Sequence, residues 1–266
     1  MALRRKKFWL FFKFLLGCIL LGSAIWFLFF SNYFKITEVK ITVTPNNLGI
    51  SNEKIYSKIK WLKGKNILLV KSEKINQQIK NEFPAIEEIK TKKIFLNQKI
   101  TIWAKTYPIA AIWCQDKKNY CFYLNRQGMA FQKSPLLGGN LFLVINDSSN
   151  RDLTVKQTFI SKNFLDFILK LNDLLEQNNL SANKFEIENF PIEDLTVWIK
   201  NPIKVKSFFD FNLSSVQQVI KLKKTIDEII QEGEDKNAVY QIDLRIKDKS
   251  YWQKLEVNKQ KVKSKK

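Results

Sequence analysis

The side chains that could carry out catalysis form no recognisable catalytic pattern. The chain of 266 residues has no histidine, which removes Ser-His and Cys-His catalysis and every His-ligated metal site. The neighbouring carboxylates in Glu87-Glu88 and Asp227-Glu228 point to different faces on a strand and suit solvated positions, so no general acid–base pair stands out. Only 8 glycines are present, and no Gly-rich phosphate loop occurs. The sequence therefore predicts a protein that is not an enzyme and binds no cofactor or metal.

Two cysteines are spaced for a disulfide. If Lys117-Lys118 forms a two-residue hairpin loop, Cys114 lies opposite Cys121 with Cα atoms about 5.5 Å apart, within disulfide range. Such a bond can form outside the cytoplasm. A pair of free thiols is an equal alternative because Lys-Lys is a poor tight turn. The third cysteine, Cys18, lies in an apolar run and is expected only to pack.

A candidate binding element lies late in the chain, in the stretch VYQIDLR from Val239 to Arg245. Tyr240, Ile242 and Leu244 alternate with polar residues, which is typical of a strand with one buried face. If this is the last strand of a sheet, it lies at an edge and offers unpaired N–H and C=O groups to another chain. The alternative is an ordinary core strand with a solvated Arg245.

A long apolar segment near the N-terminus precedes the predicted strands and helices. Four basic residues, Arg4 to Lys7, stand before a run from Phe8 to Phe30 that only Lys13 interrupts. The run is long enough to cross the roughly 30 Å hydrocarbon layer of a bilayer. Because basic residues stay in the cytoplasm, residues 1–7 are expected inside and the remainder outside.

A cleaved signal peptide is the competing interpretation of this segment. Gly22-Ser23-Ala24 is a small-residue stretch that could be a cleavage site. Cleavage there would leave the apolar stretch IWFLFF on the mature protein, and the run is longer than a usual signal-peptide core. A retained single-pass transmembrane helix is therefore the prediction.

Residues 34–106 alternate between strand and helix patterns. The stretch YFKITEVKITV reads as a strand whose apolar phase changes at Thr37-Glu38, which indicates a bulge or kink. Ser51 and Ser72 each precede apolar residues at helical spacing, so both are expected to cap helices. Two strands, 86–95 and 99–105, follow. The order strand, helix, helix, strand, strand predicts a small sheet covered by two helices.

Residues 107–252 read as a second, mixed α/β domain. Short strands flank a turn at Gly128, and Phe164, Leu165, Ile168, Leu171 and Leu175 mark an amphipathic helix. Three strands follow, at KFEIENF, LTVWIK and IKVKSFF. A helix over about 214–231, which carries Val216, Ile220, Ile226, Ile229 and Ile230, leads into VYQIDLR. The whole chain is thus predicted to be an α+β protein.

Several stretches, in this order, resemble the FtsQ/DivIB family of bacterial cell-division proteins. FKITEVKITV and NILLV are similar to the opening strand and the segment before the second helix of that family's POTRA domain. The passage from FPAIEEIK to YPIAAIW, the stretch YLNRQGMAF and the closing VYQIDLR match further family segments. The resemblance implies a transmembrane helix over 8–30, a βααββ POTRA domain over 34–106 and an FtsQ-type β domain over 107–252.

The resemblance also implies a function and partners. The family consists of non-enzymatic, single-pass scaffolds of the divisome at the division septum, which link early and late division proteins and help to control septal wall synthesis. The region around the final strand is implied to dock an FtsB- or DivIC-like protein, which forms a coiled coil with an FtsL-like protein. The residues implied to bind are Tyr240, Gln241, Ile242, Asp243, Leu244, Arg245, Ile246 and Trp252.

The excess of basic residues has two interpretations. The formal net charge is +20, which suggests an anionic partner such as a phospholipid or a wall polymer. The same bias, with abundant Lys, Asn, Ile and Phe, also follows from an AT-rich genome. Residues 253–266 are expected to be a basic disordered tail. Nucleic acid is not an expected partner because the predicted topology places the tail outside the cytoplasm.

Two other functions fit the same elements. A POTRA-bearing membrane protein that handles or secretes polypeptides is one, although such proteins usually carry tandem POTRA domains or a β-barrel. A membrane-anchored protein that binds the wall, or a wall enzyme that uses carboxylates alone, is the other.

Overall fold

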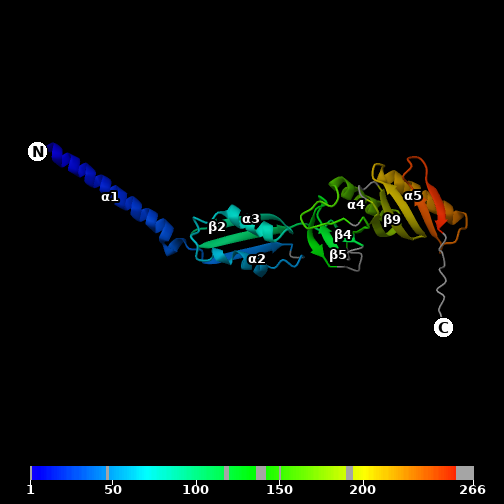
Figure 1. Cartoon of the computed structure of the whole chain (residues 1–266), viewed down its shortest axis with the longest axis horizontal. Helices are drawn as coiled ribbons and strands as arrows, with labels where there is room; N and C mark the ends of the chain where they lie inside the picture. The colour runs from blue at the N-terminus through cyan, green and yellow to red at the C-terminus, as the bar shows by residue number, and fades with distance from the viewer. Residues whose placement is uncertain are drawn as a thin grey trace, which may run out of the picture. The chain divides into compact units, whose positions relative to one another are not determined.

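The computed structural model describes residues 2–45, 48–116, 120–135, 142–149, 151–189 and 194–255. The chain divides into two compact units, Met1–Tyr107 and Pro108–Lys266 (Figure 1). Both combine helices with β-sheet, and an apolar helix opens the first. The predicted α+β class is therefore confirmed.

The N-terminal helix α1 runs from Ala2–Phe30. Its segment Lys13–Phe30 is long and apolar enough to cross a membrane, and none of that segment is buried inside the protein. Lys13 places its Nζ 4.3 Å from the centre of the Trp9 ring, one turn back along the helix. An apolar helix that the folded units leave uncovered needs another apolar environment.

The first unit is a three-stranded sheet with two helices. Its elements are β1 (Glu38–Thr44), α2 (Asn52–Ile59), a 3-10 turn (Lys60–Leu62), α3 (Ser72–Glu82), β2 (Ile86–Ile94) and β3 (Lys99–Thr106). The strand order is β1-β3-β2. Strand β3 pairs in parallel with β1 and in antiparallel with β2. The core contains buried isoleucines, among them Ile55 and Ile79 of the helices and Ile100 and Ile102 of the central strand.

Local signals in this unit are only partly as predicted. Ser51 caps α2, because its hydroxyl accepts a bond of 3.3 Å from the Lys54 N–H. The predicted cap at Ser72 is wrong: Ser72 is the first residue of α3, and no side chain caps that helix. The predicted first strand is shorter than expected and begins at Glu38, since Asn32–Phe34 form a 3-10 turn.

The second unit is a nine-stranded sheet with two long helices. Its elements are β4 (Ala111–Gln115), β5 (Tyr120–Leu124), β6 (Ala130–Ser134), β7 (Val144–Asp147), α4 (Lys162–Gln177), β8 (Ser181–Ile187), β9 (Asp194–Asn201), β10 (Lys204–Asp210), α5 (Ser215–Gln231), β11 (Val239–Asp243) and β12 (Tyr251–Leu255). The strand order is β12-β11-β10-β9-β8-β7-β4-β5-β6. Helices α4 and α5 pack over the sheet (Figure 1).

The buried face of α5 differs from the prediction. The helix buries Val219, Leu222, Ile226 and Ile229. Two residues expected on its apolar face are exposed, Val216 at 38% and Ile220 at 60%. The prediction failed in part because the predicted positions 216, 220, 226, 229 and 230 cover more of the helix circumference than one sheet can contact.

The hairpin region near the start of this unit follows the predicted strands. Cys114 lies opposite Cys121 across β4 and β5, and the two form a disulfide. The predicted loop residues Lys117-Lys118 lie outside the described residues. Gly128 has a φ of 75°, and a Cβ there would lie 2.1 Å from the Ile160 carbonyl oxygen. Only glycine fits this turn.

Candidate protein-interaction edge of the second unit

The strand predicted to be an edge is not one. Strand β11 pairs in parallel with β10, where Val205 faces Tyr240, and in antiparallel with β12, where Ile242 faces Trp252. The prediction of a free edge from Tyr240 to Ile246 is therefore wrong. The last strand of this sheet, among the residues that the structure describes, is β12.

The side chains of β11 follow the predicted alternation. Tyr240, Ile242 and Leu244 are fully buried and belong to the main core of the unit. The Tyr240 hydroxyl donates a bond of 2.9 Å to the Asp235 carbonyl. Burial raises the pKa of Tyr240, so the phenol stays neutral. These three side chains are unavailable to a partner, whereas those of Gln241 and Asp243 lie on the other face, half-buried.

Arg245 is held by acids of its own chain. Its guanidinium contacts Asp243 at 2.6 Å and Asp194 at 2.6 Å, and it lies 5.2 Å from the centre of the Phe208 ring. The hydrogen bond with Asp243 raises the pKa of Arg245 and lowers that of Asp243. An acidic side chain of a partner would have to compete with these contacts.

The connection from β11 to β12 is fixed to helix α5 by one ammonium group. Lys221 Nζ lies within hydrogen-bond distance of four backbone carbonyl oxygens: Leu244 at 3.0 Å, Ile246 at 2.5 Å, Lys247 at 3.3 Å and Lys249 at 3.3 Å. Thr225 adds a hydroxyl contact of 2.7 Å with Ser250. Burial lowers the pKa of Lys221, an effect that Asp248 and Asp243 oppose.

Strand β12 presents both backbone and side chains at this edge. Trp252 is half-buried and meets Tyr240 edge to face, with ring centres 5.9 Å apart. Tyr251 is 54% exposed, and Ile246 in the preceding loop is 47% exposed. In an antiparallel pair, every second residue of an outer strand turns its N–H and C=O away from its neighbour. The sheet thus ends in a row of outward backbone groups flanked by exposed apolar side chains.

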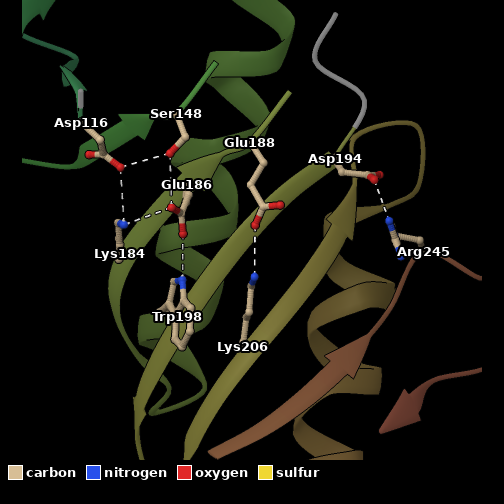
Figure 2. A network of polar contacts seen from close by, with 9 residues as sticks. All are labelled: Asp116, Ser148, Lys184, Glu186, Glu188, Asp194, Trp198, Lys206 and Arg245. Carbon is tan, nitrogen blue, oxygen red and sulfur yellow. Dashed lines mark hydrogen bonds and ion pairs between the residues drawn. The ribbon is translucent and has the colours of Figure 1, made fainter. Parts of the chain in front are cut away.

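The sheet face away from α4 and α5 carries a network of ion pairs, drawn in Figure 2. Lys184 lies 3.1 Å from Glu186 and 3.8 Å from Asp116. Glu186 also accepts a bond of 3.0 Å from the Trp198 indole N–H, and Lys206 pairs with Glu188 at 3.1 Å. Burial acts to raise the pKa of Glu186, but the bonds from Trp198 and Lys184 outweigh it and lower the pKa.

The carboxylates of the network are all paired within the chain. Each faces a cation or an N–H donor, which stabilises its charged form. The buried Asp147, which the sequence did not single out, likewise accepts bonds from Trp113 and Arg151, each at 3.2 Å. Over the described ranges, no three residues among His, Cys, Asp and Glu are grouped so that they could hold a metal ion.

Only some residues of this edge could be predicted from the sequence. The sequence indicates Trp252 and Ile246, which lie at or beside the edge. It indicates neither Tyr251 nor the contacts of the Lys221 ammonium group. The stretch YWQKL does not alternate between apolar and polar residues, so it carries no period-two signal of a strand. No family model matches this chain, and no curated protein matches it.

Proposed function

We propose that this chain is a non-enzymatic, single-pass membrane scaffold of the bacterial divisome, of the FtsQ/DivIB type. The proposal places the N-terminus in the cytoplasm and both units outside, at the division septum. The order strand, helix, helix, strand, strand directly after an apolar helix supports a POTRA assignment of the first unit. The second unit would be the FtsQ-type β domain.

The observation that carries the proposal is the outer edge of β12. A partner strand that pairs with it would extend the nine-stranded sheet and gain main-chain hydrogen bonds along its length. The exposed Tyr251 and Ile246 would add apolar contacts beside that strand. The partner we propose is the segment of an FtsB- or DivIC-like protein that follows its coiled coil with an FtsL-like protein.

Photocrosslinking in living cells tests this proposal. A photoreactive residue at Tyr251 or Gln253 should capture a small single-span protein with a coiled-coil segment, which mass spectrometry identifies. The same residue at Asn52, exposed on α2 of the first unit, is the matched control. A fluorescent fusion should concentrate at midcell, and depletion should yield undivided filaments. Even distribution round the envelope together with normal division would refute the proposal.

The rival functions predict other results. A secretion protein would crosslink to many unfolded polypeptides, and its depletion would leave division intact. A wall-binding protein or wall enzyme would sediment with, or degrade, isolated wall material. The ion-paired carboxylates of the open sheet face give that enzyme no evident acid–base pair.

A further inference from the structure

One end of the first unit gathers exposed apolar side chains that its core does not use. Outside α1, the described part of this unit exposes seven large hydrophobic residues: Tyr33, Tyr56, Leu68, Leu69, Phe95, Leu96 and Trp103. Five of them lie in the segments 31–37, 60–71 and 93–99. Leu96 is 83% exposed and Leu69 is 59% exposed.

The three segments meet where α1 ends, and we call them the α1-proximal end. The Asn66 side-chain amide donates to the carbonyls of Leu28 and Phe29, in the last turn of α1, at 2.8 and 3.0 Å. The Gln98 side-chain amide donates to the Tyr33 carbonyl at 3.0 Å. The loop between α2 and α3 and the turn between β2 and β3 therefore both lie beside the helix exit.

Backbone contacts hold this arrangement. The Ile67 N–H bonds the Phe34 carbonyl at 2.8 Å, and the Thr37 N–H bonds the Gln98 carbonyl at 2.9 Å. Ile36, only six residues after the end of α1, is buried in the core of the unit. A chain this short gives the unit little freedom to move its α1-proximal end away from the helix.

The charge of the α1-proximal end is uniform in sign. The three segments contain seven lysines, Lys35, Lys60, Lys63, Lys65, Lys71, Lys93 and Lys99, and no aspartate or glutamate. Lys99 pairs with Glu38, just outside, at 2.6 Å. Segments that combine exposed leucines with lysines suit the headgroup region of an anionic bilayer, where apolar groups enter the interface and ammonium groups meet lipid phosphates.

We infer that the α1-proximal end is a membrane-contact surface, which inserts Leu68, Leu69, Phe95 and Leu96 into the interface of an anionic bilayer. This inference rests on the proposed membrane span, because α1 must bring the surface to the lipid. It gives the two loops a role separate from the β12 edge: they fix how the first unit stands on the bilayer.

Lipid quenching of single fluorophores tests the inference on the full chain in vesicles containing phosphatidylglycerol. An environment-sensitive dye on the native Cys18 reports the span. In a Cys18→Ser background, Leu69→Cys and Leu96→Cys report the two loops, and Asn52→Cys is the control distant in the fold. The Cys18→Ser parent must take up no label, since Cys114 and Cys121 are joined.

The expected result is loss of emission at positions 69 and 96 with nitroxides near the headgroups, loss at Cys18 with nitroxides deep in the acyl chains, and none at position 52 with either. Vesicles without anionic lipid should reduce quenching at 69 and 96 and leave that at Cys18 unchanged. Quenching at Cys18 alone would overturn the contact surface while the span stands. No quenching at Cys18 would overturn the span itself, and the inference with it. Equal quenching in neutral vesicles would overturn the part assigned to the lysines.

Discussion

Replacing Lys221 with methionine should loosen the loop that sets the position of β12. The substitution keeps a long, flexible apolar side chain and removes the ammonium group. A lysine has three N–H donors, which here serve four carbonyl oxygens at 2.5 to 3.3 Å. The loop from Leu244 to Ser250 would lose its main link to α5.

The magnitude follows from the number and kind of bonds. A hydrogen bond to a charged group contributes about 1.5–3 kcal/mol. The sum for three bonds is an upper bound, because Ile246, Lys247 and Lys249 are exposed and their carbonyls can bond water in the variant. We expect a loss of about 2–3 kcal/mol in the free energy of unfolding.

Urea unfolding and amide hydrogen exchange measure the two consequences. The second unit should unfold at lower urea, and exchange should accelerate in residues 244–255 before it does so in β8 or β9. Lys224→Met is the matched control on the same helix, because its side chain is 77% exposed and its ion pair with Glu228 spans 3.7 Å. The control should change stability by no more than about 0.5 kcal/mol. Equal stability of the two variants, with unchanged exchange in the loop, would refute the claim that the Lys221 ammonium group holds this loop to α5.

Three further predictions concern the same unit. Gly128→Ala should lower the free energy of unfolding by about 3–5 kcal/mol, because its Cβ would meet the Ile160 carbonyl. Gly233 has a similar φ and open space around it, so Gly233→Ala should lower that free energy by only about 1 kcal/mol in the same urea titration. Cys114→Ser/Cys121→Ser, which opens a bridge between residues seven apart, should cost about 2.5 kcal/mol, and a reductant should lower the wild-type unfolding midpoint but not the variant's. Stability should fall in acid: the pKa of Asp243 is lowered by its bond with Arg245, and that of Glu186 is lowered although burial opposes it. Both acids therefore contribute to stability at a pH above their ordinary pKa values, 3.8 and 4.5, and this contribution is lost as the pH falls through the lowered pKa values. Asp243→Asn should make the urea midpoint depend less on pH, and an unchanged slope would contradict this assignment.

Elements with a strong apolar period could be predicted from the sequence. The helix at Lys162–Gln177 buries the five residues whose spacing predicted it. The strand VYQIDLR buries Tyr240, Ile242 and Leu244 as its alternation requires. In both elements one face meets the core, so the composition of that face alone reveals the structure.

Features set by tertiary contacts could not be predicted. Strand β12 is a short strand at the end of a sheet, and only the half-buried Trp252 ties its side chains to the core. It pairs with the side of β11 that was predicted, from the sequence, to be free for a strand of a partner protein. Lys221 reaches carbonyls 23 to 28 residues further along the chain, and no local pattern marks such a contact. The prediction of a disordered tail over residues 253–266 is wrong at its start, because Gln253–Leu255 belong to β12. Residues 256–266 lie outside the described ranges.

Residue-resolved amide hydrogen exchange across β12 is the most direct test of the proposed docking edge. The full chain in lipid nanodiscs would be compared with and without a peptide from the extracytoplasmic segment of the FtsB- or DivIC-like protein of the same cell. In the free protein, alternate amides from Tyr251 to Leu255 should exchange fast, because they point away from β11. We predict that the peptide protects those alternate amides and leaves the others as slow as before. Binding that protects no β12 amide, or no binding at all, would contradict the account.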